Sequence, residues 1–77
     1  MSFLPIIKAT KIVPILVRMG FRIVKQRGSH MHLEHLIYKN RKVTVPIHTR
    51  DLAKATLLSI LKQAGLSVKE FLDILGK

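Results

Sequence analysis

The sequence predicts a small α+β domain of the order α-β-β-β-α-α, with a three-stranded antiparallel sheet. The chain has 77 residues, no cysteine and an apolar content of 48%, which suits one domain built around a single hydrophobic core. Its middle third alternates apolar and polar residues with the period of two typical of strands, and its final third repeats apolar residues at helical spacing. We therefore expect one domain over residues 1–77, with helices on one sheet face and the other face free.

The first third is expected to hold an extended lead-in over residues 1–9 and then a helix over about residues 11–19. Thr10 is available as the N-cap, because its hydroxyl can accept a bond from a free backbone N–H. Gly20 is expected to end the helix in the left-handed conformation that glycine adopts easily. Pro14 would fall in or just after the first turn, where few backbone N–H groups have helical partners.

Three short strands are expected next, over about residues 21–26, 30–37 and 42–47. Apolar and polar side chains alternate along the first and third strands, and the second mixes the two kinds. The breaks at residues 27–29 and 39–41 are short enough for hairpins, which predicts an antiparallel meander. Pro46 has no N–H to give to a ladder, so we expect a strand end or a sheet edge there.

The next element is a helix that begins at about Leu52. Its apolar residues at helical spacing are Leu57, Ile60, Leu61 and Ala64. This spacing places them on one face of a helix, which would pack on the sheet. Asp51 or Thr49 is available as the N-cap, and Gly65 is the expected stop.

A short C-terminal helix is expected over residues 67–76. Ser67 and Glu70 have the spacing of a capping box, in which each side chain bonds to the backbone N–H of the other residue. The apolar stripe that follows consists of Val68, Phe71, Leu72 and Leu75. This stripe gives the helix one face to bury.

The charge of the chain is strongly basic, with 14 Lys and Arg against 4 Asp and Glu and a net charge of +10. Because such a charge repels itself in a small body, a polyanionic or acidic partner is expected. Membrane binding is the rival explanation, but the longest apolar run, residues 12–17, is far too short to span a bilayer. No stretch has the pattern of a signal peptide. With no cysteine to require an oxidising compartment, the expected location is cytoplasmic.

The tripeptide Gly28, Ser29 and His30 lies where the first strand turns into the second. A histidine can exchange protons near neutral pH. The cations close to it in the sequence are Lys25, Arg27, Arg41 and Lys42. Such cations can hold a phosphodiester beside the imidazole, so the tripeptide and these cations are the candidate RNA-binding residues, and His30 is the candidate catalytic residue.

RNA cleavage needs two proton transfers, because the 2′-hydroxyl must lose a proton and the departing 5′ oxygen must gain one. One imidazole cannot do both at once, so a second proton carrier or water must complete the cycle. His32 or His48 is a candidate helper for His30, and His32 shares a strand face with His30 by the period of two. On the simpler interpretation, His32, His35 and His48 are surface or hydrogen-bonding histidines.

Structural explanations of the same residues stay open. A histidine in a basic strand is more often an exposed surface residue than a catalyst. Gly28 most simply serves a turn that needs a positive φ, and Ser29 most simply bonds to nearby backbone. His30, His32 and Glu34 would share one face, but this spacing is not a defined metal motif, so no metal or other cofactor is expected.

Together these motifs resemble the HicA (YcfA-like) toxins of toxin–antitoxin systems. The matching residues are Gly20 and Phe21, residues 26–30, residues 43–46 with His48, Thr56 and Leu57, residues 60–67, and Phe71. The resemblance covers nearly the whole chain from Thr10 onward, in the same order and with the same spacing. The chain departs from the family at Pro14 and at Ala55, where the family often has glycine. Both departures concern helix geometry rather than the proposed chemistry.

The resemblance implies a metal-independent endoribonuclease toxin that cleaves mRNA, an mRNA interferase of the stress response, with a fold like that of double-stranded-RNA-binding domains. The catalytic histidine of the family follows a Gly-Ser pair, which corresponds to His30. The resemblance also implies a HicB-type antitoxin, expected to be acidic and to cover the histidine, and it implies neither a membrane nor a small-molecule cofactor. The alternative is a non-catalytic RNA-binding module of the same fold.

Overall fold

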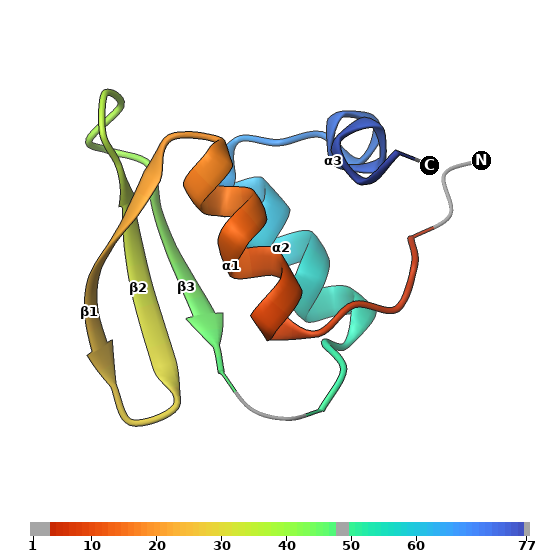
Figure 1. Cartoon of the computed structure of the whole chain (residues 1–77), viewed down its shortest axis with the longest axis horizontal. Coiled ribbons are helices and arrows are strands. Elements are labelled where there is room, and N and C mark those ends of the chain that lie inside the picture. Colours follow the sequence, from red (N-terminus) through yellow and green to blue (C-terminus); the bar gives the residue numbers. More distant parts are fainter. Residues whose placement is uncertain (1–3, 48–49, 77) are drawn as a thin grey trace.

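A three-stranded antiparallel sheet packed against helices forms the structure, a computed structural model that describes residues 4–47 and 50–76 (Figure 1). The elements are α1 (Ala9–Arg18), β1 (Phe21–Arg27), β2 (His30–His35), β3 (Lys42–Pro46), α2 (Lys54–Ala64) and α3 (Val68–Leu75). The strands lie in the order β1-β2-β3, and α1 and α2 lie on one side of the sheet. The predicted fold class and element order are therefore confirmed.

The hydrophobic core fills the space between the sheet and the helices. Its buried side chains are Ile7, Ala9, Ile12, Ile15, Leu16, Phe21, Leu33, Val43, Val45, Leu52, Leu57, Ile60, Leu61, Ala64, Leu66 and Phe71. The set includes the whole apolar face expected of α2, and each large side chain buried in this way contributes about 1.5–3 kcal/mol to stability. None of the helices in the described ranges is long and apolar enough to cross a membrane.

The start of α1 differs from the prediction. The helix begins at Ala9, with Lys8 as the N-cap residue, and Thr10 lies inside its first turn. The expected Thr10 cap is therefore wrong. Because the helix begins earlier, Pro14 lies further into it than expected, on the exposed side. At its other end the expected glycine is present, since Gly20 has a φ of +99° directly after the C-cap residue.

The start of α2 also differs from the prediction. The helix begins at Lys54 rather than near Leu52, and the expected cap by Asp51 is wrong. Asp51 instead forms an isolated antiparallel bridge with Lys8, so the backbones before α1 and α2 pair with each other. The Leu52 N–H also donates to the Ile7 carbonyl at 2.8 Å, so Asp51 and Leu52 stay outside the helix. Thr49, the other expected cap, lies outside the described residues.

The ends of α2 and α3 follow the prediction. Gly65 ends α2 in the left-handed region with a φ of 75°. At the start of α3, the Glu70 N–H donates to Ser67 Oγ at 3.0 Å, and the Ser67 N–H donates to Glu70 Oε1 at 2.9 Å. Both bonds of the capping box are therefore present. The Phe71 side chain, one turn into α3, is completely buried and fixes the helix on the core.

The two connections of the sheet lie at its opposite ends. Gly28 and Ser29 turn β1 into β2 at one end, and residues 36–41 join β2 to β3 at the other. β2 ends at His35 rather than at Ile37, because the Ile37 N–H donates to the His35 ring instead of to a strand. β3 ends at Pro46 and is an edge strand, as expected from the missing N–H of proline.

Candidate functional site

His30 opens β2 directly after the β1–β2 turn and is exposed. It pairs with Arg27 on one side and with Pro46 on the other. Directly opposite residues of antiparallel strands share a face, so the Arg27 and His30 side chains are neighbours. The turn itself requires Gly28, whose φ is +57°. The sequence pattern thus gives an imidazole beside a guanidinium at the end of the sheet.

The side of the sheet away from α1 and α2, which we term the open face, carries the polar half of β2. Leu33 and His35 are buried, whereas His30, His32 and Glu34 alternate with them along the strand. His30 and His32 are therefore on the same face, about 7 Å apart along the strand. This arrangement agrees with the period-two argument from sequence.

A β-bulge in β1 brings two cations onto the open face. Ile23 pairs with Leu33, but the next regular pair is Lys25 with His32, so one extra residue is inserted between Ile23 and Lys25. Because side chains alternate between faces, a shift of one residue exchanges the faces for the rest of the strand. Regular alternation from Phe21 would place the Lys25 side chain on the side of the helices. In the structure, Lys25 and Arg27 share the face of the two histidines.

His32 is half-buried and held by a hydrogen bond. Its Nδ1 lies 3.1 Å from Oγ1 of Thr44, the residue opposite it on β3. The Thr44 N–H in turn donates to Oε1 of Gln63 on α2 at 3.0 Å. These bonds orient the His32 ring. The other ring nitrogen, Nε2, takes no part in the bond with Thr44. A second titratable nitrogen is thus fixed on the face of His30.

A shallow cavity of about 400 Å³ lies on the open face next to His32. Its lining residues are Val24, Lys25, His32, Leu33, Glu34 and Lys42. Val24, the residue at the bulge, lines this cavity. No pattern in the sequence indicated this position of Val24. The Glu34 carboxylate forms an ion pair with Lys39, with 3.8 Å between Oε1 and Nζ. Within residues 4–47 and 50–76, no three histidine or acidic side chains come together as ligands of one metal ion would.

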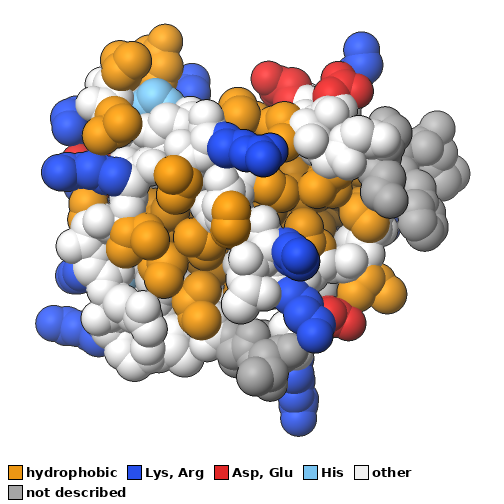
Figure 2. Space-filling view, viewed as in Figure 1, with side chains coloured by type: hydrophobic (Ala, Val, Ile, Leu, Met, Phe, Trp, Pro, Cys, Tyr) orange, Lys and Arg blue, Asp and Glu red, His pale blue; other side chains and the backbone are white. Residues whose placement is uncertain are grey.

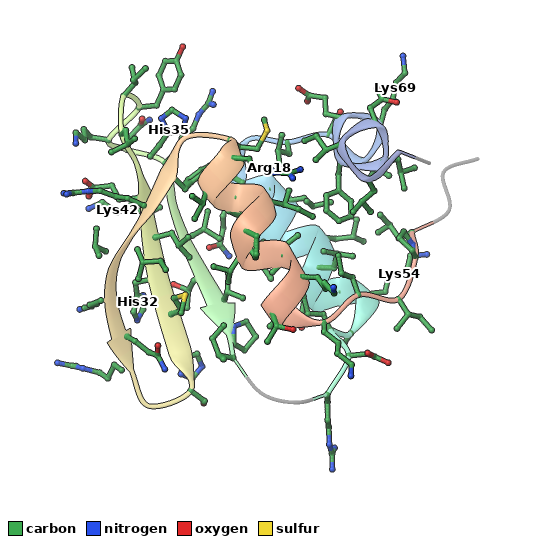
Figure 3. All side chains as sticks on the ribbon, viewed as in Figure 1. Arg18, His32, His35, Lys42, Lys54 and Lys69 are labelled. Atoms are coloured by element: carbon green, nitrogen blue, oxygen red, sulfur yellow. The ribbon has the colours of Figure 1, made fainter. Side chains whose placement is uncertain are left out.

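The structure separates the other two predicted cations from His30. Lys42 pairs with Glu34, four residues along β2 from His30, which corresponds to roughly 13 Å. Figure 3 shows Lys42 and His32 at different heights along the sheet. Arg41 lies at the opposite end of the sheet, where its Cζ is 4.5 Å from the centre of the Tyr38 ring. His48 lies outside the described residues.

His35 is buried and serves the structure. Its Nδ1 accepts the N–H groups of Ile37 at 3.1 Å and Tyr38 at 3.0 Å. Since Nδ1 accepts, Nε2 carries the proton and donates to the Met19 carbonyl at 3.1 Å. The ring also meets Phe21 edge to face, with centroids 4.9 Å apart. A hydrogen-bonding role was one of the two expected for His35, and its alternation with the buried Leu33 along β2 is the signal in the sequence that indicates burial.

These features define a class: a small basic α+β protein with a histidine and cations on the open face of its sheet. The family model described as "HicA toxin of bacterial toxin-antitoxin" matches residues 9–66, which run from the start of α1 past the end of α2. The match covers well over half of the chain, so the chain belongs to the HicA toxin family of bacterial toxin–antitoxin systems. Curated proteins gave no match. Membership implies a toxin, typically an mRNA interferase, and a cognate antitoxin.

Proposed function

We propose that this protein is a metal-independent endoribonuclease toxin in which His30 transfers a proton during RNA cleavage. One observation carries the proposal: the exposed His30 pairs with Arg27 across the sheet, on an open face that also holds Lys25 and His32. A cation beside an imidazole can hold a phosphate where the imidazole reaches the adjacent ribose. Family membership supports RNA as the substrate.

The proposed reaction uses the 2′-hydroxyl of the substrate as the nucleophile. Its oxygen bonds to phosphorus, the bond from phosphorus to the 5′ oxygen breaks, and a 2′,3′-cyclic phosphate forms. His30 takes the proton from the 2′-hydroxyl or gives one to the 5′ oxygen, and Arg27 stabilises the charge on the phosphorane. His32 is the candidate for the other transfer, because it lies on the same face as His30. His48 and water remain candidates from the sequence.

The RNA strand is proposed to run along the open face. Arg27 and Lys25 contact the phosphates next to His30, Gly28 and Ser29 bring the backbone of the turn close to the strand, and Lys42 contacts a phosphate further along. Contacts of this kind position the strand without reading its sequence. Arg41 lies at the other end of the sheet, against Tyr38, so we assign it no part in this track.

The antitoxin is proposed to be an acidic, HicB-type protein that covers His30. Opposite charges accelerate the encounter of two proteins, and the net charge of +10 suits an acidic partner. Residues 1–77 are proposed to act as one domain, in the cytoplasm, where mRNA and antitoxin are both present. A complex insensitive to salt, or one that leaves His30 accessible, would contradict this part of the proposal.

A non-catalytic RNA-binding module is the second candidate function. One observation favours it: among the described residues, no side chain forms a hydrogen bond with His30 that would orient the ring, whereas His32 has such a partner. A general base is usually oriented by a third group. In this case the same cations bind RNA, and His30 is one more contact.

The His30→Ala variant separates the two functions. We expect the rate of cleavage of single-stranded RNA to fall at least about a hundredfold, as for the loss of a general acid or base, with RNA affinity changed less than about threefold. Arg27→Gln is the matched comparison, because it removes the paired cation and should weaken RNA binding. Intact RNA after long incubation with the wild-type protein, or full cleavage by His30→Ala, would contradict catalysis by His30.

A further inference from the structure

Three consecutive apolar side chains are exposed at the end of the sheet far from His30. Leu36 is 53% exposed, Ile37 76% and Tyr38 53%. They belong to the β2–β3 connection, and Figure 2 shows apolar side chains gathered at this corner of the molecule. A run of exposed apolar residues on a small protein indicates an interaction surface. We refer to residues 36–38 as the anchor loop.

The anchor loop is held in one conformation by backbone hydrogen bonds. The buried His35 ring accepts the N–H groups of Ile37 and Tyr38. The Leu36 N–H donates to the Gly20 carbonyl at 2.8 Å, which ties the loop to the end of α1. Figure 3 shows His35 at this end of the sheet. Because the loop is already ordered, binding through it loses little conformational entropy.

The surroundings of the anchor loop are cationic. Lys39, Arg41 and Lys42 are exposed next to it, and the Arg41 guanidinium lies over the Tyr38 ring. A complementary ligand must therefore combine an apolar pocket with an acidic rim. RNA offers negative charge but no apolar pocket, and the aliphatic Leu36 and Ile37 side chains give its bases no flat surface for stacking. A protein surface fits this chemistry.

We propose that the anchor loop inserts into an apolar pocket with an acidic rim on the cognate antitoxin. The loop lies about 20 Å along β2 from His30, so this contact is a second anchor, separate from the residues proposed to act on RNA. The inference rests on the antitoxin that family membership implies, and not on catalysis by His30. An antitoxin that holds the loop and covers His30 would cover the whole open face.

The double variant Ile37→Ser/Tyr38→Ala tests the anchor. The probe is the HicB-type antitoxin of the same toxin–antitoxin pair, and the readout is the dissociation constant from calorimetry. We expect antitoxin affinity to fall at least tenfold, with RNA affinity and any RNA cleavage by the free toxin unchanged. Ile6→Ser is the matched control, because Ile6 is 80% exposed and lies outside the loop; it should change antitoxin affinity less than twofold.

Hydrogen exchange on the wild-type complex gives a second readout that needs no variant. The backbone amides of residues 39–41 and the anchor loop should exchange more slowly when the antitoxin is bound. Unchanged antitoxin affinity in the double variant, or unchanged exchange in this segment, would overturn the inference. A loss of RNA binding with intact antitoxin binding would identify the loop as an RNA surface instead. Both antitoxin readouts remain valid if His30 proves non-catalytic.

Discussion

At the scale of single residues, Gly20 allows α1 to end directly against the buried His35 ring. Its φ of +99° lies in the region that favours glycine, and a Cβ there would stand 2.8 Å from His35 Nε2. That nitrogen donates to the Met19 carbonyl, and the other side of the ring holds the anchor loop. The conformation of Gly20 and the shape of the loop are therefore linked through one imidazole.

The Gly20→Ala variant should destabilise the fold more than Gly28→Ala. Both glycines have a positive φ, but a Cβ at Gly28 would meet no described atom within 4 Å. Gly28→Ala should therefore lower the free energy of unfolding only by the cost of holding an alanine at a positive φ, about 1–2 kcal/mol. Gly20→Ala adds the contact with His35, for a total of about 2–4 kcal/mol. Urea denaturation measures both, and equal losses would contradict the role of the His35 contact.

At the scale of elements, the β1 bulge decides which chemistry the open face carries. Ile23 still follows the regular alternation, whereas Lys25 and Arg27 follow the shifted one. Without the inserted residue, Lys25 would lie opposite Met31 and point toward the helices. The alternation of apolar and polar residues in this strand does not reveal the bulge, because Val24 and Lys25 fit either face of an exposed edge strand.

The capping box of α3 makes a second element-scale contribution, one that depends on pH. The Ser67 backbone N–H, followed by the Ser67 hydroxyl, lowers the pKa of Glu70 from its usual value, and the charge of Arg41 acts in the same direction. The folded protein therefore favours the ionised carboxylate. The resulting stability is complete above the pKa of an unfolded glutamate, and it is lost as the pH falls through the lowered pKa of the folded state.

Comparison of the wild type with Glu70→Gln tests this contribution. Glutamine keeps the side-chain oxygen that accepts the Ser67 N–H but does not titrate. The wild type should exceed the variant in the free energy of unfolding near neutral pH, and the difference should stay level down to about pH 5 and shrink as the pH falls further to about pH 3. Denaturant titrations at several pH values measure it. A difference that stays constant over this range would show that the charge of Glu70 does not stabilise α3.

At the scale of the whole molecule, the net charge of +10 is distributed unevenly with respect to the proposed site. Lys25 and Arg27 lie beside the histidines and Lys42 lies further along the open face, whereas Arg41 is held at the far end of the sheet. The proposed RNA track thus uses Lys25 and Arg27 at one end, the proposed antitoxin anchor is bordered by Lys39 and Arg41 at the other, and Lys42 lies between them. Changes at the two ends of the sheet should therefore have separable effects.

The salt dependence of RNA binding measures how many of these cations contact phosphates. Three contacts predict a slope of about −2 for log affinity against log salt, or roughly 15-fold weaker binding between about 50 mM and about 200 mM salt. Lys25→Gln should reduce the slope by about 0.7, whereas Arg41→Gln should leave it unchanged. Fluorescence anisotropy with a short single-stranded RNA gives these values. Equal effects of the two substitutions would contradict the proposed track.

The sequence by itself determined the order of the helices and strands, the capping box of Ser67 and Glu70, and the family. These features depend on periodicity, turn residues and short motifs, which are local properties of the chain. The sequence also indicated His30 as the candidate catalytic residue, because the turn at Gly28 and the strand after it are encoded within a few residues. The helix caps predicted at Thr10 and Asp51 were wrong because Lys8 and Asp51, far apart in the sequence, pair through their backbones.

Only the tertiary structure decided which cations stand beside the histidines. Strand register and the bulge depend on how β1 fits against β2, so they brought Lys25 and Arg27 to the open face and left Arg41 at its far end. The conformation of the anchor loop is decided in the same way, since the Leu36 N–H donates to the Gly20 carbonyl at the end of α1, a residue far away in the sequence. Contacts between distant segments are not local properties, and they appear only when the chain is folded.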